Sequence, residues 1–106
     1  MGKIDHDAVL RARVLLLGSK QLGAWDDISW EEVLAYRVLA EVSPRAYLPK
    51  LVDGLLLAAG RSGDRRVRLD LATEAVAAAR RIPDDVPGGE GRLRHALEAQ
   101  RAATAP

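Results

Sequence analysis

The chain has 106 residues, of which 48% are hydrophobic and 29% are charged, and its formal net charge is +1. One domain with a real hydrophobic core is expected at this length and composition, which exclude disorder over most of the chain. The absence of cysteine excludes disulfides, iron–sulfur clusters and thiolate zinc sites, and the near-neutral charge gives no general attraction to DNA or to a membrane.

The first predicted element is a leucine-rich helix from Asp7 to about Gln21. Asp7 can serve as its N-cap, and Gly23 fits the position at which helices end. So much leucine implies burial on more than one side. The preceding residues contain no signal-peptide core, and no apolar run approaches the roughly 20 residues of a membrane span, so a cytoplasmic location is expected.

The stretch ISWEEV predicts the start of a second helix. Ser29 is the expected N-cap and Glu32 completes a capping box, while Ile28 and Val33 can pack together as a hydrophobic staple. The helix is expected to stop before Pro44, because the residue that precedes a proline is disfavoured in the α region.

A third helix is predicted from Tyr47 to Ala59, where apolar residues recur at three- and four-residue spacing. Pro49 is placed in its first turn, where the missing N–H costs no hydrogen bond. Gly60 and Gly63 then mark a short loop.

A fourth helix is predicted from about Asp64 to Arg81, and Pro83 ends it. Its spacing indicates an apolar face that would pack on the rest of the domain. The residues of this face are Leu69, Ala72, Ala75, Val76, Ala79 and Ile82.

A turn-forming run at 84–89 leads to a weaker last helix from about Gly91 to Ala102, in which Leu93, Ala96, Leu97 and Ala99 could dock. Residues 103–106 are expected to form a frayed tail. No segment alternates apolar and polar residues long enough to indicate a strand. Residues 1–106 are therefore predicted to form a single all-α domain, a small antiparallel bundle of about five helices.

The sequences of the second and fourth predicted helices are similar to each other. Val33–Leu39 aligns with Val76–Ile82, and Pro44 then falls on Pro87. Either an internal repeat or the chance likeness of two amphipathic helices explains this match.

Residues 35–51, AYRVLAEVSPRAYLPKL, resemble the helix-to-helix passage of tetratricopeptide repeats common in actinobacteria. The sequence GDRR at 63–66, followed by TEAV and a pair of arginines, is similar to the turn and second helix of such a repeat. The resemblance covers about residues 29–87. It implies two helical hairpins and a capping helix, stacked into a surface that binds a peptide or a protein, and it implies no catalysis.

Arginines gather at the loop between the third and fourth helices, at Arg61, Arg65, Arg66 and Arg68. Guanidinium groups beside a helix N-terminus could hold a phosphate or a carboxylate. The alternative is a solvated charged face, which the nearby Asp64 and Asp70 favour because they neutralise part of the cluster.

The stretch from Glu31 to Leu56 also permits a helix-turn-helix interpretation, in which Arg45, Tyr47 and Lys50 face a DNA groove. Pro49 lies where the recognition helix should already be running, and the near-neutral charge supplies little phosphate neutralisation. Both observations weigh against this interpretation.

No residue pattern indicates catalysis. The chain has two histidines and no cysteine, which matches no zinc spacing, and its paired carboxylates are adjacent in sequence and therefore diverge. No nucleotide-binding glycine loop is present. We therefore expect no catalytic residue, no cofactor and no metal site.

The favoured function is a non-catalytic protein–protein interaction module or accessory subunit. Its partner is expected to be another protein or a second copy of the chain, bound through the leucine-rich first helix, because two hairpins leave apolar surface at one end. The alternatives are a small helix-turn-helix DNA-binding regulator and a helical bundle with a small ligand beneath Trp25 and Trp30. The candidate partner-binding residues are Arg45, Tyr47, Lys50, Arg61, Arg65 and Arg66.

Overall fold

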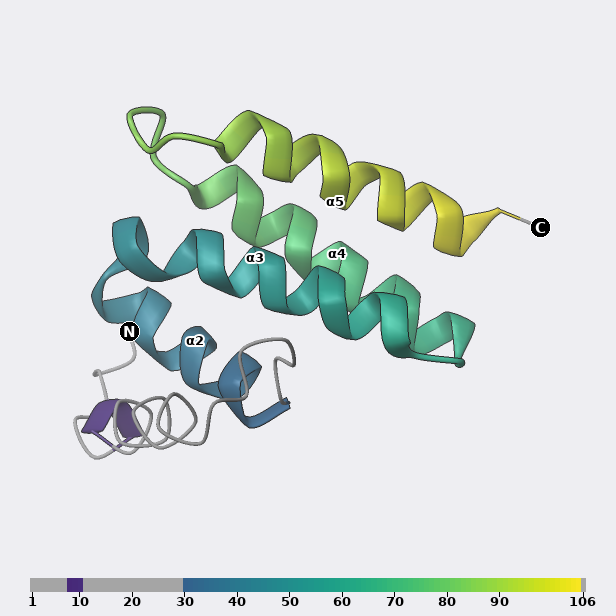
Figure 1. Cartoon of the computed structure of the whole chain (residues 1–106), viewed down its shortest axis with the longest axis horizontal. Coiled ribbons are helices and arrows are strands. Elements are labelled where there is room, and N and C mark those ends of the chain that lie inside the picture. Colours follow the sequence, from purple (N-terminus) through teal and green to yellow (C-terminus); the bar gives the residue numbers. More distant parts are fainter. Residues whose placement is uncertain (1–7, 11–29, 106) are drawn as a thin grey trace.

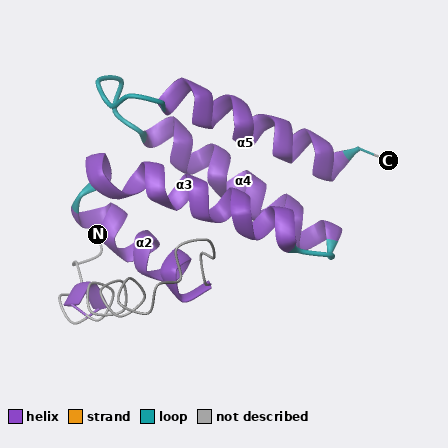
Figure 2. Cartoon of the chain, viewed as in Figure 1, coloured by secondary structure: helices purple, strands orange, loops and turns teal. Residues whose placement is uncertain are grey.

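The computed structural model describes residues 8–10 and 30–105, in which every regular element is a helix (Figure 1). The helices are α2 (Trp30–Val42), α3 (Pro44–Arg61), α4 (Arg65–Arg81) and α5 (Gly89–Thr104). Figure 2 shows that only short loops join them. The predicted all-α class is confirmed. Residues 8–10 are helical, but the rest of the predicted first helix and the capping residue Ser29 lie outside the described residues.

A single residue, Ser43, separates α2 from α3. Its backbone lies outside the α region, at φ −139° and ψ 74°, as expected for a residue that precedes proline. The Ser43 N–H donates to the Leu39 carbonyl, and the Ser43 carbonyl accepts from the N–H of Tyr47. The predicted end of the second helix before Pro44 is therefore confirmed, and the chain reverses direction within one residue.

The predicted start of the third helix at Tyr47 is wrong, because α3 already begins at Pro44. Pro44 occupies the first helical position, where its missing backbone N–H costs no hydrogen bond, because an N–H there has no partner within the helix. Pro49 lies inside the helix and removes the bond that its N–H would otherwise donate to the Arg45 carbonyl. Burial of Leu48 and Val52 on both sides of Pro49 offsets this loss.

Helix α4 begins and ends close to its predicted positions. The Asp64 side chain is the N-cap and accepts hydrogen bonds from the backbone N–H groups of Arg66 and Val67, at 2.9 and 3.4 Å. Most of the predicted apolar face is buried, although Leu69 is only half-buried. Leu71 and Ala78 are buried as well, because α4 packs between two helices and needs a wider apolar face than one neighbour requires.

Helix α5 is longer at both ends than its predicted range. Gly88 is the N-cap in the left-handed region, at φ 85°, which favours glycine. Leu93 and Leu97 are partly buried and pack against the core, and Ala96 is fully buried, as predicted. Ala103 is also buried, so the last turn of α5 docks on the molecule.

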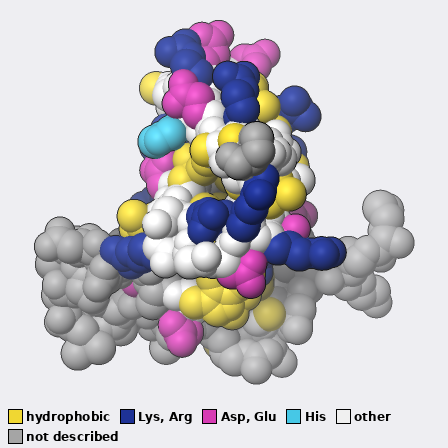
Figure 3. All heavy atoms as spheres, turned by 90° about the vertical axis from the view of Figure 1, so that its right-hand side faces the viewer, with side chains coloured by type: hydrophobic (Ala, Val, Ile, Leu, Met, Phe, Trp, Pro, Cys, Tyr) yellow, Lys and Arg dark blue, Asp and Glu magenta, His cyan; other side chains and the backbone are white. Residues whose placement is uncertain are grey.

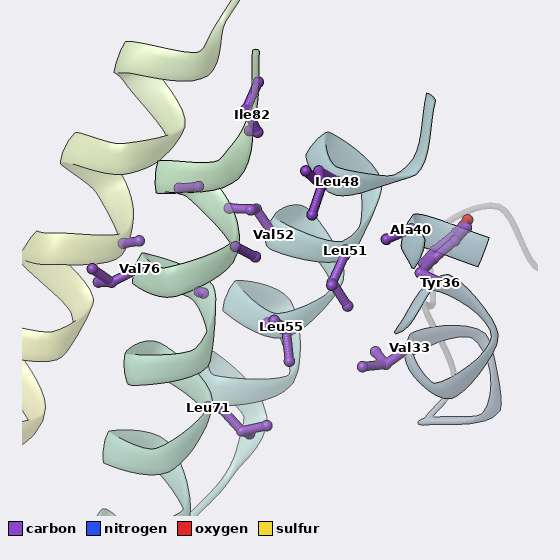
Figure 4. Close-up of a cluster of buried hydrophobic side chains, with 14 of the residues drawn as sticks. Val33, Tyr36, Ala40, Leu48, Leu51, Val52, Leu55, Leu71, Val76 and Ile82 are labelled. Carbon is purple, nitrogen blue, oxygen red and sulfur yellow. The ribbon is translucent and has the colours of Figure 1, made fainter. Parts of the chain in front are cut away.

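The helices stack in chain order, and α3 contacts each of the other three helices α2, α4 and α5. Helix α5 packs on both α4 and α3, whereas α2 packs on α3 and makes no backbone contact with α4 or α5. Figure 4 shows Val33 and Tyr36 of α2 on one side of α3, and Val76 and Ile82 of α4 on the other. A smaller apolar cluster joins Val9 to α2. The core therefore runs through the stack with α3 at its centre.

Candidate functional site

The residues predicted to bind a partner lie at the two ends of α3. Arg45, Tyr47 and Lys50 belong to its first turns, while Arg61 lies in its last turn and is followed by Arg65 and Arg66 at the start of α4. A helix rises about 1.5 Å per residue, so Arg45 and Arg61 are roughly 24 Å apart along the axis. These residues therefore form two separate groups.

In the first group, Arg45 is part of an internal ion pair. Its Nη1 donates to both carboxylate oxygens of Asp85, at 2.7 and 2.6 Å, and ties the start of α3 to the loop between α4 and α5. The hydrogen bond from Arg45, together with its charge, lowers the pKa of the Asp85 carboxyl below the ordinary value. Both side chains are exposed, so the pair lies at the surface.

Tyr47, in the same group, packs inward. Its ring lies 6.2 Å from that of Tyr36, with the ring planes tilted by 31°, and it contacts both apolar clusters. Burial raises the pKa of the Tyr36 hydroxyl, and the charge of Glu32 and the neighbouring Tyr47 raise it further. Because Tyr47 packs inward and Arg45 is paired with Asp85, this geometry does not favour a recognition helix with Arg45, Tyr47 and Lys50 directed at DNA.

In the second group, the arginines organise the end of the stack at which α5 terminates. Arg65 donates from Nε to the Ala103 carbonyl at 2.8 Å and from Nη2 to the Ala105 carbonyl, so it holds the last turn of α5. Arg68 donates to the Ser62 carbonyl at 3.0 Å and holds the loop between α3 and α4. The side chain of Arg66 is exposed.

The N-terminus of α4, considered above as an anion site, is occupied by the chain's own carboxylate. Asp64 accepts the N–H groups of Arg66 and Val67, which a bound phosphate would otherwise need. This arrangement favours the interpretation of these arginines as a charged face rather than as a phosphate loop.

An open groove lies between α3 and α5 at the same end. It encloses about 290 Å³ and exists because Gly60, Ala99 and Ala102 have little or no side chain to fill it. A Cβ atom added at Gly60 would meet no atom within 4 Å. The complete lining is Leu56, Ala59, Gly60, Arg68, His95, Ala99, Ala102 and Ala103. The sequence signal for this groove is the spacing of the small residues Ala99, Ala102 and Ala103 in α5, which the periodicity of large apolar residues does not reveal.

Two further hollows flank α5. One, of about 590 Å³, lies where Arg65, Arg66, Leu69 and Asp70 of α4 face Ala103 and Thr104. The other, of about 630 Å³, lies beneath the loop between α4 and α5 and is lined by Arg80, Arg94 and residues 86–91. Both mix charged and apolar side chains and are open to solvent.

Of the two tryptophans predicted to cover a ligand pocket, Trp25 lies outside the described residues. Trp30 is 47% exposed, and the guanidinium carbon of Arg37 lies 5.0 Å from its ring centroid. This is the geometry of a cation–π contact, so Arg37 covers part of the ring. Within residues 8–10 and 30–105, no three histidine, aspartate or glutamate side chains gather as a metal site would require.

None of the described helices has the length and apolarity needed to cross a membrane. Comparisons with protein-family models, with curated proteins and with solved structures found no match to this chain.

Proposed function

We propose that the chain is a non-catalytic protein-interaction module, or accessory subunit, that holds a segment of another protein on its helical stack. The groove between α3 and α5 is the observation that carries this proposal. It is open and mostly apolar, and its walls are two helices that pack directly on each other. Binding sites on packed helices keep their shape better than sites on loops.

Under this proposal α3 and α4 are one hairpin of a tetratricopeptide-like stack, and α5 closes its end. The outward face of α5 supports a closing role, because Glu90, Arg94, Glu98 and Arg101 are all exposed there. A terminal helix with a polar outer face ends a stack without leaving apolar surface. The module would act in the cytoplasm.

Self-association through the leucine-rich first helix remains part of the proposal, although most of that helix lies outside the described residues. Sedimentation analysis of the full chain over a range of concentrations tests it. If the measured mass equals that of one chain at every concentration, self-association is rejected, while the proposal that the groove binds a partner is unaffected.

A capture experiment with a filled groove tests the main proposal. Three tagged baits are used in parallel in an extract of the native host: the wild-type chain, the Ala102→Leu variant and the Ala77→Leu variant. The proteins that each bait captures are identified by mass spectrometry. Ala102 is exposed and lines the groove, whereas Ala77 is exposed on α4 and does not line it. We expect a partner that the wild type and Ala77→Leu retain and Ala102→Leu loses. Identical capture by all three baits would show that the groove does not bind.

A further inference from the structure

We propose that the arginine-rich end of the stack selects an acidic amphipathic segment of the partner protein, with the α3/α5 groove receiving its apolar side chains. This inference rests on the proposed function and names the chemistry of the partner. It follows from the distribution of charge over the described residues, together with the lining of the groove.

Although the net charge is near neutral, the charged side chains are distributed unevenly over the described residues. Arginines gather where α4 begins and α5 ends, at Arg65, Arg66, Arg68 and Arg101, and Figure 3 shows Lys and Arg side chains over this end of the molecule. The acidic residues in the same segments are Asp64 and Asp70, and Asp64 is engaged as the N-cap of α4. This end therefore carries excess positive charge.

Several acidic residues elsewhere are paired with arginines. Asp53 pairs with Arg92, Glu74 with Arg37, and Asp85 with Arg45. Glu41 likewise pairs with Arg81. Ion pairs thus join arginines to carboxylates along the body of the stack, whereas Arg65 and Arg68, at the end where the groove opens, donate to backbone carbonyls. A complementary partner brings carboxylates to that end.

The groove itself has no acidic lining residue. Its polar contributors are Arg68 and His95, and the remainder of its lining is leucine, alanine and glycine. A cavity of about 290 Å³ admits aliphatic side chains but not a folded domain. An amphipathic segment fits both features, because its apolar face can enter the groove while its carboxylates meet Arg68 in the groove and the other arginines at the same end of the molecule.

A protein segment fits this end better than a nucleic acid does. Nucleic-acid binding depends on neutralising many phosphates along a strand, and single strands stack their bases on aromatic side chains. Here the groove between α3 and α5 is lined by no Phe, Tyr or Trp on which a base could stack. We therefore treat nucleic acid as an outcome of the test.

The test measures fluorescence anisotropy of labelled peptides with the full chain. The probes are helical peptides of about four turns, built from Leu, Ala and Glu, with matched peptides in which Lys or Gln replaces Glu. A random-sequence DNA duplex is the fourth probe. We expect the Glu peptide to bind at least about tenfold more tightly than the Lys peptide and to weaken as salt rises, as charge complementarity requires.

Point variants test where on the molecule the Glu peptide binds. Arg66→Glu is expected to weaken the Glu peptide about tenfold, and it should fold, because a carboxylate in the first turn of α4 suits the helix dipole. Arg80→Glu, at the other end of α4, is the matched charge control and should leave affinity nearly unchanged. Ala102→Leu should also weaken binding, and Ala77→Leu should not. Circular dichroism confirms that each variant retains its helices.

Three outcomes would overturn the proposal. The first is equal affinity for the Glu, Lys and Gln peptides. The second is tighter binding of the duplex than of the Glu peptide at the same salt concentration. The third is a failure of the Glu peptide to bind or to respond to Arg66→Glu. If the Gln peptide binds as tightly as the Glu peptide and Ala102→Leu weakens both, the acidic preference is lost but the groove remains a protein-binding site. The proposed function is judged separately by capture from the extract.

Discussion

Arg37 of α2 holds Glu74 of α4 through two hydrogen bonds, from Nε to Oε2 at 2.7 Å and from Nη2 to Oε1 at 2.6 Å. The two helices make no backbone contact, so this pair spans the space between layers that α3 separates. Arg81 and Glu41 form a second link between the same helices, at 3.3 Å. The ion pairs therefore connect two helices whose backbones are not in contact.

The coupling between Arg37 and Glu74 should be measurable. Both side chains are about two-thirds buried and the geometry is bidentate, whereas Arg81 and Glu41 are mostly exposed and share one contact. We expect a double-mutant cycle with Arg37→Gln and Glu74→Gln to give a coupling free energy of about 1 kcal/mol in urea unfolding. The corresponding Arg81 and Glu41 cycle should give about 0.3 kcal/mol. Equal couplings would contradict the difference in burial.

Leu55 should be among the most costly residues to truncate. It is 0% exposed at the centre of α3, while Leu57, two residues along the same helix, is 37% exposed. Leu55→Ala leaves a cavity and should lower the free energy of unfolding by about 2–5 kcal/mol. Leu57→Ala, the same chemical change at the surface, should cost less than about 1 kcal/mol. Urea denaturation of both variants makes the comparison, and similar losses would argue against this packing of α3.

Two glycines at the start of α5 should respond to alanine in opposite directions. Gly88 has φ +85°, and a Cβ there would lie 2.6 Å from Nη1 of Arg92, which is itself held by Asp53. Gly88→Ala should therefore destabilise the fold by about 1–2 kcal/mol. Gly91 lies in the helix with open space around it, so Gly91→Ala should stabilise the fold by about 0.5–1 kcal/mol. Thermal unfolding distinguishes the two signs, and stabilisation by Gly88→Ala would exclude the left-handed cap.

The Arg45–Asp85 pair should make the free energy of unfolding depend on pH in the acid range. Because the pKa of Asp85 is lower in the folded chain than in the unfolded one, the folded state binds fewer protons there. The stability from this pair is present above the ordinary carboxyl pKa and is lost as the pH falls through the lowered value. Arg45→Gln should return the pKa of Asp85 towards its ordinary value in an NMR titration. An unchanged titration in the variant would show that Arg45 is not the cause.

Local signals in the sequence predict much of the fold. The rule that a residue preceding proline leaves the α region places the end of α2 at Val42, and the periodicity of apolar residues places α4 nearly to its ends. The same local logic fails at Pro49, because it assumes that a proline in a helix belongs to the first turn. In α3 the burial of neighbouring leucines overrides that preference. Where local sequence rules conflict, tertiary packing determines where a helix begins.

The candidate site is much harder to predict. The sequence indicates the arginine cluster, but the roles of its members depend on partners such as the Ala103 carbonyl, 38 residues from Arg65. The groove depends on how α3 and α5 are rotated against each other, and spacing within one helix does not contain that information. Tyr47 and Arg45 illustrate the same limit, since both take part in contacts within the chain.

Because α3 lies between α2 and α4 and also touches α5, the protein cannot separate α3 from its surroundings without opening the whole stack. Its central amides, in the turn from Leu51 to Leu55, should therefore exchange with deuterium only through global unfolding. Helix α2 packs on α3 alone among the described helices, and α5 lies at the other end of the stack, so we expect the amides of both to exchange sooner than those of α3. If α5 binds a partner as proposed, such a stack would let that helix loosen while the core around α3 stays closed.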